Sequence, residues 1–281
     1  MLIFREIADL RAHIAEQRLA GKTIGFVPTM GALHEGHLDL IHSSNGASDV
    51  TVCSIFVNPA QFNEQSDFDS YPIRLEEDAE KLESAHCDVL YIPTVNDIYP
   101  EGEYEKPDFD FGGLDRRMEG EFRPGHFVGV GEVIKRFLEI LDCDKIFLGE
   151  KDFQQVLIIK SVIDQFGFDV EVVPVPTKRE KDGLAMSSRN LLLKPEARKS
   201  ANKIYETLRW IKNNFEAENM DKILEEASRR INESPALEVE YLSFANAQTL
   251  DFLKKEKEEP VVVCTAVWAE GVRLIDNIVV K

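Results

Sequence analysis

Two histidines within one short turn are the side chains of this chain best suited to chemistry. The segment 28–38 (PTMGALHEGHL) follows an apolar run at 23–27, which is typical of a buried parallel strand, and the apolar residues after Gly36 indicate a helix. A turn from strand to helix directs unpaired backbone N–H groups and the positive end of the helix dipole to one place, which favours an anion. His34 and His37 could both face that anion, one as a donor to phosphate and one as a proton carrier.

Two other interpretations of these histidines stay open at this point. Histidines in a surface turn can simply be solvated, and a histidine pair can also bind zinc. The order His34-Glu35-Gly36-His37 is not the His-Glu-x-x-His pattern of metalloproteases, because the second histidine comes one residue too early. The pattern therefore does not favour a metalloprotease.

Polar residues also follow the next predicted strand, at 50–57. Gln61 carries both a donor and an acceptor, which suits a substrate hydroxyl or carboxylate, and Asn58 could orient a neighbouring imidazole. The alternative is that both side chains only satisfy the backbone of the turn. In open α/β sheets ligands bind at the carboxyl ends of the strands, where these residues are placed.

The arrangement of strand, glycine-containing turn and helix occurs again at 145–166. Lys151 can meet a phosphate at the start of the predicted helix 156–166, and Gln155 lies one turn further along. After a further strand at 169–175, the loop 176–190 ends in two hydroxyls beside Arg189, a combination suited to holding phosphate. Such a loop could close over a triphosphate.

The acidic residues at 76–78 open a predicted helix at 75–85, where the helix dipole favours negative charge. A magnesium contact is the alternative for them. A basic island at 116–126 precedes a predicted helix at 130–141. Gly129 and Gly131 lack the third glycine and the preceding strand of a dinucleotide fingerprint, so they indicate a close backbone approach at a helix start.

The order of these elements predicts an α/β fold, a Rossmann-like, doubly wound and mostly parallel sheet, with a smaller C-terminal α/β domain. A helix at 4–20 precedes the first strand, and another strand is expected at 89–92. Beyond 195 we expect helices at 196–213 and 221–231, strands at 239–244, 261–268 and 272–280, and a charged surface at 254–259. We place the boundary at 176–190, so that residues 1–176 form the domain with the anion-suited turns and residues 177–281 form a lid.

Composition limits the class of protein. The chain has 281 residues, 43% hydrophobic and 30% charged, as in an ordinary globular protein. A net charge of −18 argues against nucleic acid or an anionic membrane as the main partner. We expect no signal peptide, no membrane span and a cytoplasmic location. The four cysteines are scattered among apolar residues, so we expect buried, reduced thiols.

Five motifs resemble, in order and spacing, those of the pantoate–β-alanine ligase family. They are MGALHEGH at 30–37, FVNPAQF at 56–62, RPGHF at 123–127, GEKDFQQ at 149–155 and DGLAMSSRN at 182–190, and the resemblance continues to RLIDN at 273–277. It implies an ATP-dependent ligation in two steps. The carboxylate of pantoate attacks the α-phosphorus of ATP and releases pyrophosphate, and the amine of β-alanine then displaces AMP from the pantoyl adenylate. The resemblance also implies Mg²⁺ and a homodimer.

The same resemblance implies roles for individual residues. His37, the expected proton donor, would act in catalysis with His34, Lys151 and Arg189, and Gln61 and Gln155 would hold pantoate and β-alanine. Glu77 and Asp78 align with a possible magnesium site. The segments expected along ATP comprise Met30, Gly31, Ala32, Leu33, His34, Glu35, Gly36, His37, Gly149, Glu150, Lys151, Asp152, Lys178, Met186, Ser187, Ser188 and Arg189.

Two positions depart from the family pattern. The family commonly has Tyr-Pro-Arg where this chain has Tyr71-Pro72-Ile73-Arg74, so any role of that arginine would have to pass to Arg74. Lys178 replaces a usually apolar residue that touches adenosine, which would preserve a backbone contact but not a side-chain contact.

Two rival functions fit part of the pattern. A nucleotidyltransferase of the same fold would share the histidine turn and the Ser-Ser-Arg loop, but the pair Gln61 and Gln155 argues against it. A nucleotide-binding regulator without catalysis would not need the full set of charged side chains.

Overall fold

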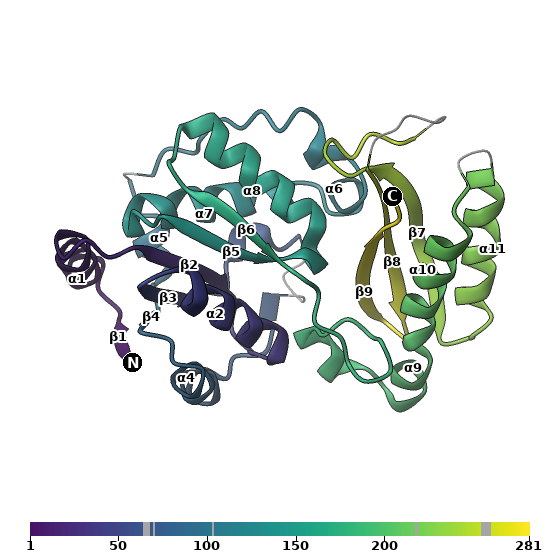
Figure 1. The fold of residues 1–281 in the computed structure, drawn as a ribbon, viewed down its shortest axis with the longest axis horizontal. Helices are drawn as coiled ribbons and strands as arrows, with labels where there is room; N and C mark the ends of the chain where they lie inside the picture. Colours follow the sequence, from purple (N-terminus) through teal and green to yellow (C-terminus); the bar gives the residue numbers. More distant parts are fainter. Residues whose placement is uncertain (64–67, 70, 103, 217–218, 254–259) are drawn as a thin grey trace.

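The computed structural model of the protein describes residues 1–63, 68–69, 71–102, 104–216, 219–253 and 260–281. The expected charged surface at 254–259 lies outside these residues. The chain forms two β-sheets, each covered by helices, and β9 of the second sheet faces the first part of the chain (Figure 1). Among the described residues, no helix is long and apolar enough to cross a membrane.

The larger sheet has six strands, and every pairing within it is parallel. The strand order is β1-β4-β3-β2-β5-β6, so the chain adds strands towards one edge of the sheet after β2 and towards the other edge after β5. The position between β2 and β5 is the topological switch point, where ligands bind in open α/β sheets. β2 and β3 are almost wholly buried, in keeping with their mostly apolar sequences. The strands are β1 (Leu2–Phe4), β2 (Ile24–Thr29), β3 (Val50–Ile55), β4 (Val89–Tyr91), β5 (Lys145–Gly149) and β6 (Glu171–Val175).

Helices pack on both faces of this sheet. One face packs against α2 (Glu35–Ala47) and α4 (Leu75–Ser84), and the other against α1 (Ile7–Leu19), α7 (His126–Leu141) and α8 (Phe153–Phe166) (Figure 1). This is the doubly wound arrangement that the sequence predicts. Shorter helical segments connect these elements: η1 (Pro59–Gln61), α5 (Val95–Ile98), η2 (Leu114–Arg116), α6 (Glu119–Phe122), η3 (Glu150–Asp152) and η4 (Ser188–Leu192).

The smaller sheet is antiparallel, in the order β7-β8-β9. The helices α10 and α11 cover its outer face, while its inner face packs on η2 and α8 of the first part through a separate apolar cluster around Met118 and Val262. Its elements are α9 (Pro195–Ser200), α10 (Asn202–Asn214), α11 (Met220–Asn232), β7 (Leu237–Asn246), β8 (Val261–Ala269) and β9 (Val272–Val279).

The predicted elements are present, with five main differences. The helix predicted at 4–20 begins at Ile7, because Leu2–Phe4 form β1. β1 is an additional edge strand of three residues, too short to show a pattern of its own. α7 begins at His126 rather than 130, and α8 at Phe153 rather than 156. The helix predicted at 196–213 is divided at Ala201 into α9 and α10, and no sequence signal marks that division.

Gly129 lies in the first turn of α7, where η1 packs on the helix. A Cβ on this residue would lie 2.2 Å from the carbonyl oxygen of Ala60, so only glycine lets η1 pack directly on the helix. The close backbone approach predicted for this glycine is confirmed.

The four cysteines are buried and unpaired, as predicted.

An ion-pair network joins the two sheets. Arg273 of β9 contacts both carboxylate oxygens of Glu119, with distances of 2.6 Å from Nη1 to Oε2 and 2.9 Å from Nη2 to Oε1, and its Nη2 lies 2.6 Å from Glu240 Oε2. The hydroxyl of Tyr241 donates to Glu119 Oε1 at 2.9 Å. Burial alone would raise the pKa of Glu119, but the hydrogen bonds and charge of Arg273 outweigh it and hold the pKa below its ordinary value.

We predict that Arg273→Met destabilises the protein by about 3–5 kcal/mol, because two carboxylates would lose the cation that they share in a largely buried site. The measurement is the free energy of unfolding in urea at pH 7. Arg229→Met is the matched control, since Arg229 pairs with Glu226 and Glu233 on the surface of α11 and 60% of its side chain is exposed. A control loss of more than about 1 kcal/mol, or an equal loss in both variants, would contradict this prediction.

The same pair gives a pH dependence of known sign. Since the pKa of Glu119 is lowered in the folded protein, its stabilising contribution is present above the ordinary value of 4.5 and is lost as the pH falls through the folded pKa. We therefore expect the difference in the free energy of unfolding between wild type and Arg273→Met to shrink as the pH falls towards and below 4.5. Urea unfolding at a series of pH values would show this.

Candidate active site

A buried carboxylate holds the turn between β2 and α2. The two oxygens of Asp78 on α4 accept the backbone N–H groups of Ala32 and Leu33, both at 2.7 Å. Gly31 and Ala32 both have positive φ, +84° and +50°, a conformation that these bonds stabilise. Lys81 donates to the carbonyl oxygen of Leu33 at 2.8 Å, which adds a positive charge beside the carboxylate. The turn is therefore held by side chains of α4, and these contacts leave the N-terminus of α2 open.

Hydrogen bonds to the backbone define the orientation of the two histidines. Nδ1 of His34 accepts the N–H of Gly36 at 3.1 Å, and Nδ1 of His37 accepts the N–H of His34 at 3.2 Å. Since both Nδ1 atoms accept, each neutral ring carries its proton on Nε2. The rings lie 4.0 Å apart between centroids, so two N–H donors stand side by side at the start of the helix.

These imidazoles are uncharged at neutral pH. Burial and the positive charge of Lys151 lower the pKa of His34 to about 4. Burial, followed by His34 and Lys151, lowers the pKa of His37 well below its ordinary value of 6.5. Lys151 lines the same cavity as both rings. The free protein thus offers two neutral N–H donors beside one fixed cation.

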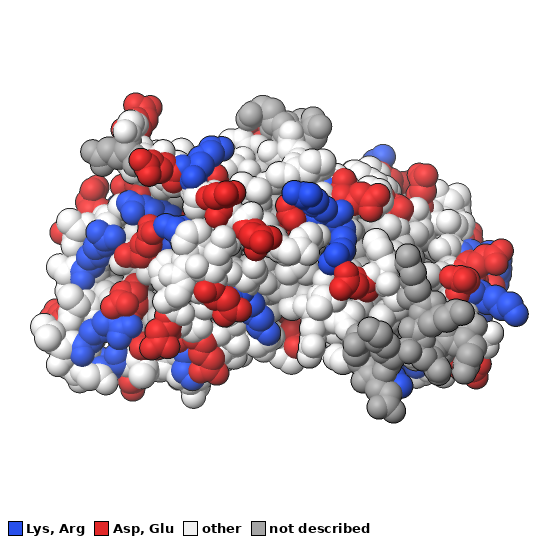
Figure 2. Space-filling model, turned by 90° about the horizontal axis from the view of Figure 1, so that it is seen from above, with Lys and Arg blue, Asp and Glu red and all other residues white. Residues whose placement is uncertain are grey.

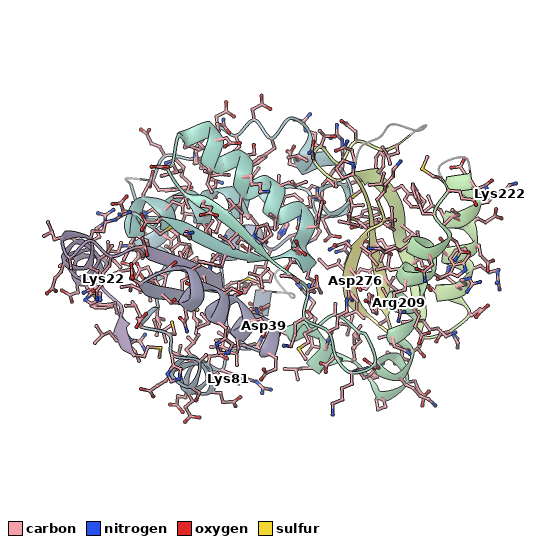
Figure 3. All side chains as sticks on the ribbon, in the orientation of Figure 1. Lys22, Asp39, Lys81, Arg209, Lys222 and Asp276 are labelled. Carbon is pink, nitrogen blue, oxygen red and sulfur yellow. The ribbon has the colours of Figure 1, made fainter. Side chains whose placement is uncertain are left out.

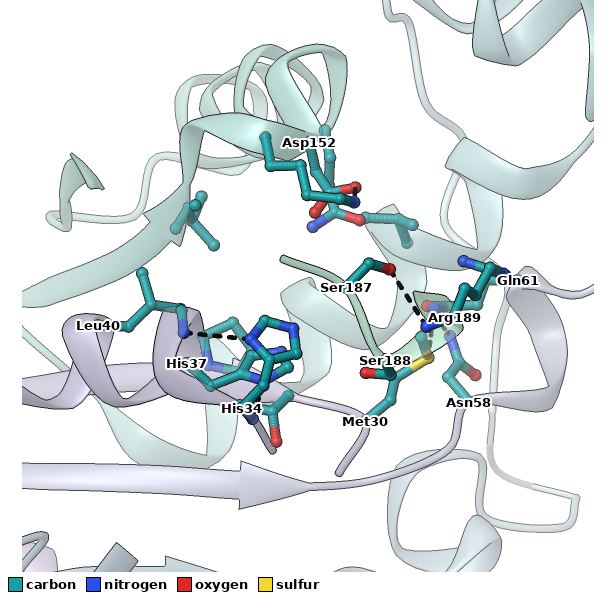
Figure 4. A pocket seen from close by; sticks show the side chains of 18 of the residues that line it. Met30, His34, His37, Leu40, Asn58, Gln61, Asp152, Ser187, Ser188 and Arg189 are labelled. Carbon is teal, nitrogen blue, oxygen red and sulfur yellow. Dashed lines mark hydrogen bonds and ion pairs between the residues drawn. The ribbon is translucent and has the colours of Figure 1, made fainter. Parts of the chain in front are cut away.

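A cavity of about 220 Å³ lies in front of these groups, at the switch point between β2 and β5. Figure 4 shows the two imidazoles on one side of it, and Arg189, Gln61 and Asn58 on the other. Part of its wall is apolar, formed by Pro28, Phe56, Val130, Val133, Ile134, Phe137 and Leu148. The cavity thus combines anion-binding groups with a hydrophobic side.

Asn58 positions Gln61. Its amide nitrogen donates to Gln61 Oε1 at 3.2 Å and to the carbonyl of Gly129 at 3.0 Å, while its oxygen accepts the hydroxyl of Tyr99 at 2.8 Å and the N–H of Ala60 at 3.2 Å. The expectation that Asn58 orients an imidazole is wrong, because its four partners are Gln61, Gly129, Tyr99 and Ala60. The alternative is met for Asn58, which satisfies the backbone of the turn and also holds the side chain of Gln61.

Arg123 and His126 stand out in the sequence as part of a basic island and of the RPGHF motif, with no role assigned to either, and both line the cavity. Nη1 of Arg123 lies 3.2 Å from Nε2 of His126, and Nδ1 of His126 lies 2.8 Å from the carbonyl oxygen of Gln61. Burial and the charge of Arg123 lower the pKa of His126 to about 4. The RPGHF motif was the available signal, but its distance along the chain from Gln61 hid the contact.

The loop after β6 brings its hydroxyls and Arg189 to the cavity. Oγ of Ser187 accepts the N–H of Arg189 at 3.3 Å, and Oγ of Ser188 donates to the carbonyl of Ala32 at 3.2 Å (Figure 4). Lys178 pairs with Asp39 of α2, with 2.9 Å between Nζ and Oδ2. The loop is therefore connected at one point to the histidine turn and at another to α2.

Most of the predicted residues come together, and some do not. Gln61 and Gln155 line the cavity, together with Met30, His34, Gly36, His37, Gly149, Lys151, Asp152, Lys178, Met186, Ser187, Ser188 and Arg189. Five residues of the predicted ATP segments lie outside its lining: Gly31, Ala32, Leu33, Glu35 and Glu150.

The predicted magnesium ligands do not form a cation site. Both oxygens of Asp78 are used by backbone N–H groups, and the ammonium of Lys81 is 4.0 Å away. Glu77 pairs instead with Arg74 on the outside of α4. Among the described residues, no group of three or more His, Cys, Asp or Glu side chains is arranged to hold a metal ion. Arg74, the residue to which the role of the family's arginine would have to pass, forms an ion pair with Glu77 and does not line the cavity.

Figure 2 shows acidic and basic side chains interspersed over the face that it displays. The positive groups of the site are therefore a local feature of a chain with a net charge of −18.

Comparison with known proteins gives one consistent result. Residues 2–279 match the family Pantoate-beta-alanine ligase. The chain is 40% identical to a pantothenate synthetase of Cytophaga hutchinsonii, covering 100% of this chain and 99% of that protein. It is also 43% identical to one of Aquifex aeolicus, covering 98% of both proteins.

Solved structures agree with these sequence matches. The crystal structure of pantothenate synthetase from Thermus thermophilus has a TM-score of 0.92 and 37% identity, covering 100% of both chains. That of a pantoate-beta-alanine ligase from Francisella tularensis, in complex with beta-gamma ATP and beta-alanine, has a TM-score of 0.84 and 35% identity, covering 99% of this chain and 97% of the other.

The histidines generate a prediction for the free protein. We expect NMR titration of ring-labelled histidine to show His34 titrating near pH 4, with no change between pH 6 and 8. A bound triphosphate should raise this pKa, because negative charge stabilises the imidazolium.

Since the folded pKa of His34 lies below the ordinary 6.5, the unfolded state binds more protons between these two values, so the free energy of unfolding should fall as the pH drops from 6.5 towards 4. His34→Gln assigns the signal, and titration near 6.5 would contradict the prediction.

Asp78 generates a second prediction. Asp78→Ala would leave two buried N–H groups without acceptors, and we expect a loss of about 2–6 kcal/mol in the free energy of unfolding. The loss should be the same with and without MgCl₂. Glu77→Ala is the control on the same helix and should change stability by less than about 1 kcal/mol. A stabilisation by MgCl₂ that disappears in both variants would show instead that the pair binds the metal.

Proposed function

The chain belongs to the pantoate–β-alanine ligase family and is an ATP-dependent ligase, and we propose that it joins (R)-pantoate to β-alanine through a pantoyl adenylate. The observation that carries the proposal is the shared cavity at the switch point. There, the N–H donors of His34 and His37 and the cation of Lys151 lie in one cavity with Gln61 and Gln155.

The first step transfers adenylate to pantoate. A carboxylate oxygen of pantoate forms a bond to the α-phosphorus of ATP as the bond to the leaving pyrophosphate breaks. Negative charge grows on the phosphate oxygens, where Lys151, Arg189 and the two Nε2–H groups can receive it. His37 begins this step neutral and therefore acts first as a hydrogen-bond donor. Its role as the proton donor stays a prediction.

The polar and apolar walls of the cavity suit the acid substrate. Pantoate carries hydroxyl groups beside a carbon with two methyl groups. Gln61 and Gln155 can bond the hydroxyls and the carboxylate, while Val130, Ile134 and Phe137 offer apolar surface for the methyl groups. Asn58 holds Gln61 in place and so contributes to orienting the carboxylate towards phosphorus.

In the second step the amine of β-alanine forms the amide bond at the carbonyl carbon of the adenylate, and AMP leaves. The adenylate needs protection from water, and the part of the chain from 177 onwards can give it by lying over the cavity. We propose that residues 1–176 bind the substrates and that residues 177–281 act as this lid.

Magnesium, a homodimer and a cytoplasmic location stay predictions from the sequence and its resemblance. Since Glu77 and Asp78 do not form a cation site, any Mg²⁺ would enter with the phosphates of ATP. No step above depends on it.

The assay mixes purified protein with ATP, MgCl₂ and pantoate, with and without β-alanine, and measures AMP, pyrophosphate and pantothenate. We expect AMP and pantothenate in equal amounts, only when β-alanine is present. Pyrophosphate released in many turnovers without an amide product would support a nucleotidyltransferase instead. No turnover in any mixture would support a nucleotide-binding regulator.

Lys151→Ala should lower kcat by roughly a hundredfold to a thousandfold, because one charged donor to the developing negative charge is lost. Lys160→Ala is the matched control, since Lys160 is an exposed residue of α8, outside the cavity lining. The measurement is the steady-state rate of pantothenate formation. Equal rates in the two variants would show that Lys151 has no part in the chemistry.

A further inference from the structure

Two adjacent residues of β9, Asp276 and Asn277, reach from the smaller sheet to the turns that carry the phosphate-binding groups. Their side chains are buried, and Asp276 lies at the junction between the two sheets (Figure 3). In the sequence they stand out only as the end of the RLIDN motif, and neither has a part in the reaction proposed above.

Asn277 holds the turn of Lys151. Its amide nitrogen donates to the carbonyl oxygens of Glu150 and Lys151, both at 2.9 Å. The turn η3 has only three residues, and no side chain caps its start at Gly149. Two bonds from one amide therefore restrain the backbone at Lys151, which lines the same cavity as the histidines.

Asp276 holds the loop of Ser187–Arg189 through Arg179. The two side chains form a bidentate ion pair, with distances of 2.7 Å from Nη1 to Oδ2 and 2.9 Å from Nη2 to Oδ1. The guanidinium of Arg179 also lies over the ring of Tyr205, at 3.7 Å from its centroid. Such a planar, buried pair restrains orientation as well as distance.

Arg179 stands at the base of a short hairpin. It pairs with Ala185 in an antiparallel bridge, and the N–H of Met186 donates to the carbonyl of Lys178 at 2.9 Å. The hairpin ends directly before Ser187, so a restraint on Arg179 is passed on to the hydroxyls and to Arg189. Asp276 is also connected to its neighbour, since its Oδ1 accepts the N–H of Asn277 at 2.8 Å.

We propose that Asp276 and Asn277 are positioning residues that set both halves of the phosphate-binding site from one strand. Asn277 places Lys151, and Asp276 places the loop of Arg189, so the complete set of cations forms only where β9 is docked. This inference rests on the proposed ligase function, because it assigns these residues to the same site. The alternative is that they only join the two sheets, as other contacts do.

Asn277→Asp is the sharpest test, because the side chain keeps its shape and loses its donors. A carboxylate would face two carbonyl oxygens, and the turn of Lys151 should shift. We expect kcat to fall by roughly tenfold to a hundredfold, in line with the cost of a small misplacement, while KM for pantoate stays unchanged. As the pH falls and the new carboxyl gains a proton, it can donate again, so the ratio of variant to wild-type kcat should rise.

Arg117→Ala is the matched control. Arg117 joins the same two parts of the chain, through an ion pair of 2.8 Å to Asp251 and a bond of 2.9 Å to the carbonyl of Thr249, and it does not line the cavity. If Asn277 only joined the sheets, both variants would lose activity alike and neither would regain it at low pH. Unchanged kcat in Asn277→Asp, or equal losses in both variants, overturns the inference. Circular dichroism checks the fold, and Asn277→Ala replaces Asn277→Asp if the latter does not fold.

The Asp276 half is tested with Asp276→Asn, which keeps the shape and removes the charge that pairs with Arg179. We expect KM for ATP to rise by about tenfold, in the range given by the loss of a charged hydrogen bond. An unchanged KM for ATP would overturn the assignment of Asp276.

A binding measurement separates failure of this inference from failure of the proposed function. Calorimetry measures the affinity of wild type and variants for an ATP analogue that cannot be hydrolysed. If wild type binds the analogue but forms no pantothenate, the ligase proposal fails. The positioning inference is then supported if Asn277→Asp binds the ATP analogue tenfold more weakly than wild type while Arg117→Ala binds it as wild type does. Equal affinities of wild type and Asn277→Asp for the analogue would overturn it.

Discussion

The carboxylate of Asp78 is the constraint on which the rest of the site depends. It lies wholly buried behind the histidine turn and accepts two backbone N–H groups, which stabilises two successive residues with positive φ. Without these two hydrogen bonds, the positive φ values between β2 and α2 would not be stabilised. The first N–H groups of α2 would then not be held towards the cavity. The His34 and His37 side chains then cap the helix and present their Nε2–H groups. A residue outside the cavity thus decides what the cavity can bind.

The charges of the site are arranged for a substrate that brings its own negative charge. The protein carries a net charge of −18, so attraction of ATP at long range is not its means of binding. Instead, Lys151 and Arg189 line the same cavity as imidazoles whose pKa values are lowered by burial and by Lys151 itself. In the free protein the imidazoles add no positive charge to the site. The negative charge of the polyphosphate would then balance the charges of Lys151 and Arg189. Such a preorganised set of donors loses little free energy to rearrangement during the reaction.

The smaller sheet contacts the elements that carry residues of the cavity. Its strand β9 carries Arg273, which holds Glu119, and the pair Asp276 and Asn277, which contact the loop of Arg179 and the turn of Lys151. Buried ion pairs with directional geometry contribute little net stability, but they penalise any other arrangement of the parts that they join. β9 is therefore the strand of the smaller sheet that contacts both the loop of Arg179 and the turn of Lys151.

The sequence by itself determined the order of strands and helices, the anion-suited turns after β2 and β5, and the family, because these depend on local periodicity, turn chemistry and motifs read in order. It also placed Lys151 and Gln61 among the candidates, as the structure places them at the cavity. Only the tertiary structure decided between the alternatives for Asn58 and Asp78, since their partners lie on other elements: Tyr99 and Gly129 for Asn58, Ala32 and Leu33 for Asp78. It likewise brought His126 to Gln61 and Asn277 to Lys151, contacts between residues 65 and 126 positions apart. Pairings across such separations depend on how whole elements pack, and no local pattern in the chain records that packing.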